Sequence, residues 1–537
     1  MYTNSLDPEA AEALLRSYGV QGTDAEFSAL IRLCDYHPQA LECVGVILGQ
    51  LANNHASRIN DSDVLEAVIY QLLGSDASQL ALLFYSSTYR RVGYVEFGLK
   101  RADFRLGLRL TSAFGQADRS SWSEREREKC PETGFLPIKH DHALFLTDLG
   151  ELKQAETILR ELAFAPQSYY YPDGQDKTLY QYAARQNLCD VLVLAGRLRE
   201  AEQIADGMIQ AYESDLIIRN GVAQSETLLF RIMVGERCFG RNKLYSGSNP
   251  YARRAVALSL QGKVREALTD FKQAEAFFLR KTPPDYLQMA AIRRLRRLGQ
   301  PIPKDWNELE LGHRTLIGQA AIFYALLLTR LGKLDGALKV LNYSKRCAAQ
   351  RTNNLPSMVV CAELGLSDVY RLKGEYELAQ QNLQHPLEWA TQTGQQETYC
   401  WAHLSLARLR HAQNQLPEAH NALDEAYKAA TAHGFKLYEI DCLVTAGRIA
   451  LSRQDLVTAE KKAEIALTLV SDPDMAYAWG HGNSLHLMGE VLFQKNDLEK
   501  AQRFLTGAAK LRERIEDPRL RNTQELLSQL SDTAQGD

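Results

Sequence analysis

The sequence predicts an all-α fold: a right-handed superhelical solenoid of stacked helical hairpins, preceded by a small N-terminal helical domain. The first observation is a repeated frame, in which a small residue is followed by a turn residue seven positions later, an apolar residue two after the turn and an alanine five after it. The second is that the frame occurs eight times in order. Because one hairpin cannot bury its apolar face alone, consecutive copies predict a stacked array.

Each position of the frame has a physical role in a hairpin. Two antiparallel helices approach closely where each offers a residue with little side chain, which accounts for the small residue and the alanine. The turn residue ends the first helix, and Gly and Asn adopt left-handed backbone geometry most easily. The eight turn residues are Gly150, Gly196, Gly262, Gly332, Gly374, Asn414, Gln454 and Asn496.

The frame resembles the tetratricopeptide repeat, whose small residue, turn glycine and second-helix alanine hold the same positions. The resemblance runs from about residue 137 to the C-terminus, so we expect residues 137–537 to form a tetratricopeptide-like solenoid. The turn residues are separated by 46, 66, 70, 42, 40, 40 and 42 residues. That family uses about 34. The longer spacing predicts longer helices, with extra elements or degenerate repeats in the two wide gaps.

Composition restricts the class of protein. The chain has 537 residues, of which 45% are hydrophobic and 24% charged, as in folded soluble proteins. A net charge of −4 gives no overall attraction to nucleic acid or to an anionic membrane. The nine cysteines stand singly and predict buried thiols in a reducing compartment. Without a signal-peptide pattern or an apolar run of membrane length, the sequence leads us to expect a cytoplasmic protein.

Residues 1–75 are expected to form the small helical domain. Asp7 followed by Pro8 marks the start of a first helix, which Gly19 ends. A second helix is expected over residues 24–36 and a third over residues 37–51. This arrangement predicts a compact unit that is distinct from the repeats.

Residues 6–51 resemble the helical segment that follows the P-loop core in STAND-class ATPases, a class of signal-transduction regulators. The likeness rests on an acidic leader, a Leu-Leu helix end and the motif HPQAL at residues 37–41, with Tyr36 in place of the usual Gly. In that class the proline of the motif lies against the bound adenine. The alternative is that Pro38 is only the first residue of a helix after a turn.

Residues 432–451, AHGFKLYEIDCLVTAGRIAL, resemble the late repeats of bacterial STAND proteins. The phosphate-binding motif GxxxxGK[ST] is absent from the sequence, since the Gly-Lys pairs at 262–263 and 332–333 are followed by Val and Leu. We therefore expect no cofactor and no ATPase activity. The resemblances imply the C-terminal tetratricopeptide-repeat sensor region of a bacterial STAND-class regulator, with the ATPase domain on a missing or separate chain.

Residues 76–136 are expected to be a degenerate helical or winged-helix-like remnant that ends in a polar linker. A tyrosine-rich stretch, residues 168–182, then interrupts the repeats. Because exposed tyrosines make good recognition surfaces, Tyr169, Tyr170 and Tyr171 form a candidate partner-binding loop. The alternative is that these rings pack on the next helix.

The first helix of each hairpin lines the concave face of such a solenoid. Counting six and three residues back from the last four turn residues gives Asp368/Arg371, Arg408/His411, Arg448/Leu451 and Glu490/Phe493. Among these, Arg371, Arg408, His411 and Arg448 predict a cationic stripe suited to an acidic peptide or a phosphate, with Arg408 and Arg448 exposed. The alternative is that these residues only solubilise the face.

Other candidate motifs favour no further activity. The basic run at 293–297 is interpreted as a solvated helix face, so no nucleic acid is expected. His140 and His142, like His481 and His486, lack the spacing and partners of a metal site, and no metal is expected. No catalytic motif is found, so the chain is not expected to be an enzyme.

The predicted function is therefore a non-catalytic protein-interaction scaffold or ligand-sensing region of a STAND-type regulator. The first alternative is a free-standing tetratricopeptide-repeat adaptor that holds two proteins together. The second is a repeat-fused enzyme with an unrecognised site. The expected partner is a protein or peptide, acidic in character.

Overall fold

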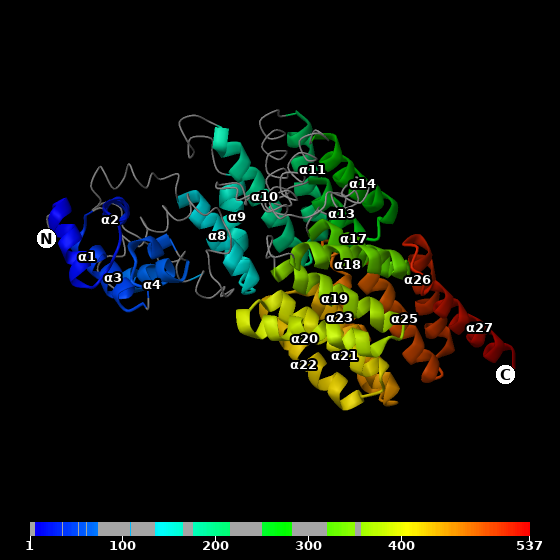
Figure 1. The fold of residues 1–537 in the computed structure, drawn as a ribbon. Helices are drawn as coiled ribbons and strands as arrows, with labels where there is room; N and C mark the ends of the chain where they lie inside the picture. Colours follow the sequence, from blue (N-terminus) through cyan, green and yellow to red (C-terminus); the bar gives the residue numbers. More distant parts are fainter. Residues whose placement is uncertain are drawn as a thin grey trace, which may run out of the picture. The chain divides into compact units, whose positions relative to one another are not determined.

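A computed structural model describes residues 6–34, 36–51, 53–60, 62–73, 108, 135–164, 175–214, 250–281, 319–349 and 356–536. Within these ranges every regular element is a helix, apart from an isolated bridge between Gln21 and His55, so the all-α prediction is confirmed. The chain divides into two compact units (Figure 1). The first comprises residues 1–146, 166–180 and 238–244, and the second comprises residues 147–165, 181–237 and 245–537.

The start of the first unit is a group of short helices. They are α1 (Pro8–Ser17), α2 (Asp24–Leu33), α3 (Pro38–Gly49), η1 (Ala56–Asn60) and α4 (Ser62–Leu73). Asp7 caps α1 by accepting a hydrogen bond from the backbone N–H of Ala10 at 2.7 Å, and Thr23 and Glu26 form a capping box on α2. The predicted helix starts are confirmed, whereas α2 and α3 end two or three residues earlier than expected.

Tyr36 lies between α2 and α3 with a φ of 61°, in the left-handed region that favours glycine. Its backbone N–H donates to the carbonyl of Ile31, and that of His37 donates to the carbonyl of Cys34. These bonds reverse the chain within the few residues that separate the two helices. Residue 36 therefore occupies a position that requires left-handed geometry, which glycine adopts more easily than tyrosine.

The second unit is a row of helical hairpins, in which helices that are consecutive in sequence are in contact from α11 onward (Figure 1). The boundary between the units falls within α8 (Phe135–Asp148) and again after Tyr180. The first helices of the second unit are α9 (Leu152–Phe164), α10 (Gln175–Leu194), α11 (Leu198–Ser214), α13 (Pro250–Leu260), α14 (Val264–Lys281), α17 (Gln319–Arg330) and α18 (Leu334–Ala349). The others are α19 (Pro356–Leu372), α20 (Tyr376–Thr393), α21 (Gln396–Ala412), α22 (Leu416–His433), α23 (Lys436–Ser452), α24 (Leu456–Val470), α25 (Ala478–Gln494), α26 (Leu498–Arg514) and α27 (Leu520–Gly536).

All eight predicted turn residues have positive φ, from 58° at Gln454 to 82° at Gly150. Helix-ending hydrogen bonds accompany them, such as the bond from the N–H of Gln415 to the carbonyl of Arg410 at 2.8 Å. The small residue and the alanine of every copy are buried, so the hairpin prediction is confirmed. These pairs are Ala143/Ala155, Cys189/Ala201, Ala255/Ala267, Ala325/Ala337, Ser367/Ala379, Ala407/Ala419, Gly447/Ala459 and Gly489/Ala501.

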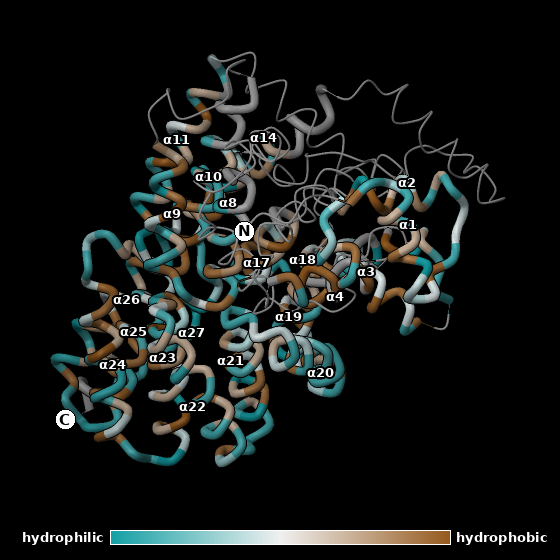
Figure 2. The backbone as a smooth tube through the Cα atoms, turned by 90° about the vertical axis from the view of Figure 1, so that its left-hand side faces the viewer, coloured by the Kyte–Doolittle hydropathy of each residue, from teal (hydrophilic) through white to brown (hydrophobic). Residues whose placement is uncertain are grey.

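The early hairpins of the second unit lie against the late ones. Trp479 at the start of α25 donates its indole N–H to the carbonyl of Ser259 on α13 at 2.7 Å. Close by, the turn at Gly262 approaches Ala478 and Ile515 so tightly that an added Cβ would collide with both. The row of hairpins therefore turns back on itself and encloses an interior. Figure 2 shows hydrophilic residues at the outer corners between hairpins and hydrophobic residues along the helices that face one another.

Several sequence predictions fall outside the described residues. They are the helices and linker expected between 76 and 134, the tyrosines Tyr169, Tyr170 and Tyr171, and the basic run at 293–297. Six cysteines that are described, Cys34, Cys43, Cys189, Cys361, Cys400 and Cys442, are free thiols, and all except the half-buried Cys361 are buried. No helix in the described ranges is long and apolar enough to cross a membrane.

Candidate functional site

The interior of the second unit contains a cavity of about 680 Å³, a size typical of ligand pockets. Its walls come from α13 and α17, from the first helices of the later hairpins (α19, α21, α23 and α25), and from the connection between α26 and α27. All four predicted groove residues, Arg371, Arg408, His411 and Arg448, line this cavity. The structure thus brings together side chains that the repeat frame had placed at equivalent positions.

Arg408 is neutralised within the protein. Its guanidinium lies 2.9 Å from a carboxylate oxygen of Asp441, and its side chain is 27% exposed. Burial opposes the charge, but Asp441 and Asp368 together raise the pKa of Arg408. Asp441 also accepts a hydrogen bond from the hydroxyl of Tyr477 at 3.1 Å. The expectation of an exposed Arg408 is therefore wrong, because a carboxylate from the next hairpin covers it.

Arg371 is paired less completely. Its nearest carboxylate oxygen, on Asp368, is 3.5 Å away, and its buried Nε has no acceptor among the described residues. The carboxylate of Asp368 also accepts hydrogen bonds from the indole of Trp401 and the hydroxyl of Ser405, each at 3.3 Å. Burial lowers the pKa of Arg371, and the charge of Asp368 opposes this shift only in part.

Arg448 is the groove residue whose charge is least compensated. Within the described part of the chain no hydrogen bond or ion pair reaches its guanidinium, and the side chain lines the cavity. Burial lowers the pKa of Arg448; Glu490 opposes the shift, while Arg519 and Arg408 add to it. An added anion stabilises a cation in these surroundings, because the anion supplies the missing hydrogen-bond acceptors and a compensating negative charge.

His411 is neutral near pH 7. Burial lowers its pKa from the usual range, and the nearby charges of Arg448 and Arg371 lower it further. Its Nε2 lies 2.9 Å from the hydroxyl of Ser452. The predicted cationic stripe therefore consists of three guanidinium groups and a neutral imidazole, which can donate or accept a hydrogen bond.

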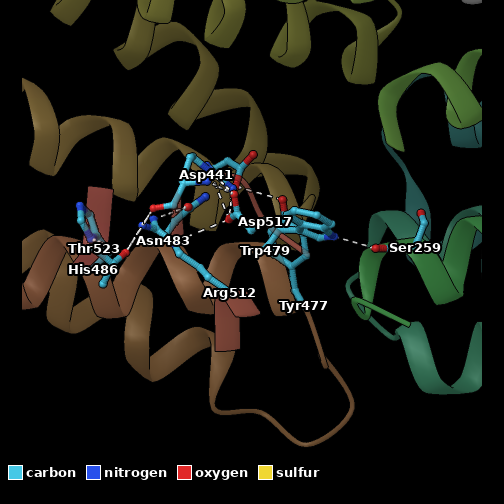
Figure 3. A network of polar contacts seen from close by, with 10 residues as sticks. Ser259, Asp441, Tyr477, Trp479, Asn483, His486, Arg512, Asp517 and Thr523 are labelled. Atoms are coloured by element: carbon cyan, nitrogen blue, oxygen red, sulfur yellow. Dashed lines mark hydrogen bonds and ion pairs between the residues drawn. The ribbon is translucent and has the colours of Figure 1, made fainter. Parts of the chain in front are cut away.

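A buried polar network beside these residues was not predicted (Figure 3). At its centre, Arg512 donates to the hydroxyl of Thr523 at 2.5 Å and to the side-chain oxygen of Asn483 at 3.3 Å. The Nε of Arg512 lies 3.6 Å from Asp517, and each of these side chains is 1% exposed. The hydroxyl of Thr523 also lies 3.2 Å from Nδ1 of His486. Burial and the surrounding arginines lower the pKa of His486 to about 2, so this imidazole is neutral.

Asp517 joins this network to the cavity through Arg519. Arg519 contacts both carboxylate oxygens of Asp517 at 2.8 Å, and its side chain is 41% exposed. Arg512, Arg519, Asn483 and His486 all line the cavity.

The repeat frame could have predicted some of the cavity-lining residues that the sequence analysis did not name. Counting six and three residues back from Gly262 and Gly332 gives Val256/Ser259 and Leu326/Thr329, and all four line the cavity. Arg512 and Arg519 flank a further left-handed turn at Glu516, between α26 and α27, with a φ of 55°. That turn has no alanine five residues later, since Arg521 stands there, so the frame does not detect it.

A further lining residue, Glu397 on α21, has a strongly shifted pKa. Burial raises the pKa of Glu397 to about 7; a hydrogen bond from the hydroxyl of Tyr438 at 3.1 Å opposes the shift, and Asp148 and Asp190 add to it. In the same region burial raises the pKa of Asp148 to about 6. These carboxyl groups bind protons more tightly in the folded state than in the unfolded state.

Replacing Glu397 with glutamine is therefore expected to stabilise the protein at pH 8 and not at pH 4.5. The pKa of Glu397 is near 4.5 in the unfolded state and about 7 in the folded state. Because the folded wild type binds the proton more tightly, its free energy of unfolding falls as pH rises from 4.5 to 7. Glutamine does not ionise and avoids this loss, on the order of 1–3 kcal/mol. Melting temperatures at both pH values test this, with the exposed Glu377→Gln as control. An equal effect of Glu397→Gln at both pH values would contradict it.

Among the described residues no group of His, Cys, Asp and Glu is arranged to hold a metal ion. The chemistry available in the cavity is hydrogen bonding and charge pairing from several guanidinium groups, next to apolar and aromatic walls. This set of groups suits the binding of an anionic ligand.

Comparison with known proteins identifies the class of repeat. Residues 358–432, within α19 to α22, match the tetratricopeptide repeat family. The second unit therefore contains a tetratricopeptide repeat region, and the predicted solenoid fold is confirmed. No curated protein matches the chain.

Several solved structures are similar to this chain. The Rap protein complexed with competence and sporulation factor aligns at 14% identity over 74% of this chain and 98% of its own, with a TM-score of 0.41. A STAND protein with a tetratricopeptide repeat sensor from Pyrococcus horikoshii aligns at 12% identity over 98% of this chain and 78% of its own, with a TM-score of 0.34. Yeast Tom70 aligns at 11% identity over 89% of this chain and 97% of its own, with a TM-score of 0.33.

Proposed function

We propose that the second unit is a ligand-sensing region that binds an anionic segment of a peptide or protein partner inside its cavity. The observation that carries this proposal is the guanidinium of Arg448, which lines the interior cavity and has no acceptor among the described residues. The neutral His411, on the neighbouring hairpin, lies close enough to Arg448 and to Arg371 for both charges to lower its pKa. Binding requires no chemical step, so the proposed role is not that of an enzyme.

The size of the cavity favours a sensor over an adaptor that holds two folded proteins together. Because α13 lies against α25 through the contact between Ser259 and Trp479, the proposed binding groups face a cavity of about 680 Å³. A cavity of this size accepts a small ligand or a short peptide segment. Two folded partners would each need roughly 800 Å² of open surface. The adaptor remains the alternative function, with Tyr169, Tyr170 and Tyr171 as its candidate surface.

We further propose that ligand binding is coupled to a STAND-type ATPase carried outside residues 1–537. Two sequence resemblances to that class, at residues 6–51 and 432–451, support this proposal. The left-handed φ of Tyr36 adds support, since it occurs at the place where the class has glycine. In this proposal the N-terminal helical unit transmits the bound state of the cavity to the ATPase.

Replacing Arg448 with glutamine is expected to weaken the binding of an acidic peptide by roughly ten- to 150-fold, because the neutral amide loses a charge-assisted contact worth roughly 1.5–3 kcal/mol. Fluorescence anisotropy with a labelled glutamate-rich peptide measures the affinity, and a lysine-rich peptide of equal length tests for charge selectivity. Arg503→Gln is the matched control, since Arg503 is exposed on α26 and does not line the cavity.

Equal affinity of the wild type and Arg448→Gln would show that the cavity is not the binding site. The tyrosine-rich loop would then become the candidate, to be tested by replacing Tyr169, Tyr170 and Tyr171 together. Unchanged helical circular dichroism of each variant is required for this comparison.

A further inference from the structure

The cavity carries more positive than negative charge among the residues that the structure describes. Six guanidinium groups line it, those of Arg330, Arg371, Arg408, Arg448, Arg512 and Arg519. The carboxylates next to these groups are those of Asp368, Asp441, Asp517 and Glu490. Arg330 has no ion pair among the described residues, and its guanidinium carbon lies 5.9 Å from the centroid of the Trp479 ring. Glu397 also lines the cavity, and burial raises the pKa of its carboxyl to about 7. Even with Glu397 ionised, the six guanidinium groups outnumber the five carboxylates.

Three of the six arginines converge from different elements. Arg371 ends α19, Arg448 lies in the last turns of α23, and Arg519 belongs to the connection between α26 and α27. All three line the same cavity, and the charge of Arg519 contributes to lowering the pKa of both Arg371 and Arg448. Like charges brought together in this way raise the free energy of the empty cavity, and a multiply charged anion relieves that repulsion.

The donors fit a tetrahedral group better than a planar one. A carboxylate offers two oxygens, whereas a phosphate monoester offers three and carries close to two negative charges at pH 7. Arg448 presents its whole guanidinium, and Arg371 is only partly engaged by Asp368 at 3.5 Å. Arg519 is 41% exposed; Asp517 engages its Nε and Nη2, which leaves Nη1 as its donor to a ligand. Neutral His411 and Asn522 on the same wall can donate further hydrogen bonds.

The rest of the cavity suits an organic group. Phe323, Leu326, Trp401, Leu404 and Val444 line it beside the arginines. A volume of about 680 Å³ far exceeds that of a phosphate group alone, and aromatic walls favour an apolar or ring-containing body. The cavity thus combines basic side chains with apolar and aromatic ones.

We infer that Arg371, Arg448 and Arg519 form a subsite for a phosphate monoester whose organic part lies against the apolar wall. This inference rests on the proposed function, because it names the chemical class of the anionic group that the sensor takes. The monoester comes either from a small organophosphate or from a phosphorylated side chain of a peptide.

Isothermal titration calorimetry with the full chain tests this inference, with phenyl phosphate, benzoate and inorganic phosphate as probes. Phenyl phosphate is expected to bind at least tenfold more tightly than either of the others. Arg448→Gln is expected to weaken phenyl phosphate binding about tenfold, and Arg503→Gln to leave it unchanged. A phosphotyrosine pentapeptide, compared with its unphosphorylated form and with phenyl phosphate, then distinguishes a peptide source from a small molecule.

The outcomes separate the two proposals. If benzoate binds as tightly as phenyl phosphate and both depend on Arg448, the phosphate subsite is overturned and the anion-binding sensor stands. If inorganic phosphate binds as tightly as phenyl phosphate, the organic part of the inference is overturned. If neither these probes nor the acidic peptide binds, both proposals are overturned.

Discussion

Replacing Arg512 with alanine is expected to destabilise the second unit by about 3–5 kcal/mol, as removal of one partner of a buried ion pair does in other proteins. The substitution removes one of the two cationic partners of Asp517, whose carboxylate is 1% exposed and stays paired with Arg519. It also removes the donors to Thr523 and Asn483, at 2.5 and 3.3 Å. Because these contacts join α25, α26 and α27, the loss acts on three helices together.

Urea denaturation followed by circular dichroism gives the change in the unfolding midpoint, and hydrogen exchange shows where the protection is lost. We expect faster exchange in α25, α26 and α27, with little change in α1 to α4. The matched control is Arg514→Ala, two residues away and exposed on α26, which is expected to cost less than about 0.5 kcal/mol. A midpoint for Arg512→Ala that equals that of the control would mean that the network does not stabilise the unit.

The repeat frame predicted the hairpins well because its positions are set by local geometry. A left-handed turn needs a permissive residue, and a close helix crossing needs two small ones, wherever the hairpin lies. The identity of the turn residue carries further information. Gly150, Gly196 and Gly262 are buried, whereas Gly332, Gly374, Asn414, Gln454 and Asn496 are exposed. The turns that another part of the unit covers are therefore all glycines, and the larger turn residues all stand where the turn is open to solvent.

The chemistry of the cavity could be predicted only in part, since it depends on contacts between hairpins. The count from the turn residues placed Arg371, Arg408 and Arg448 on one wall, and they lie there. The same count cannot show that Asp441, 33 residues after Arg408, neutralises it and leaves Arg448 as the uncompensated group. The turning back of the solenoid depends on contacts as distant as that between Ser259 and Trp479, 220 residues apart.

Replacing Gly262 with alanine is expected to lower the free energy of unfolding by roughly 1–3 kcal/mol more than replacing Gly374 with alanine does. The reason is that the change at Gly262 also overpacks a contact. Both glycines have left-handed φ, 75° and 80°, so both variants carry a similar backbone strain of about 1 kcal/mol. A methyl group at Gly262 meets the side chains of Ile515 and Ala478, whereas a methyl group at Gly374 meets nothing within 4 Å.

The difference in unfolding free energy between the two variants measures how much the contact between the early and late hairpins contributes to stability. Urea denaturation midpoints measure it, and hydrogen exchange at α13 and the start of α25 shows whether the hydrogen bond from Trp479 to Ser259 loosens with it. We expect Gly262→Ala alone to weaken binding of the acidic peptide, since the cavity opens when this contact is lost. If the two variants have the same stability and the same affinity, the approach of Gly262 to Ile515 does not hold the cavity closed, and an open groove becomes the better description of the binding surface.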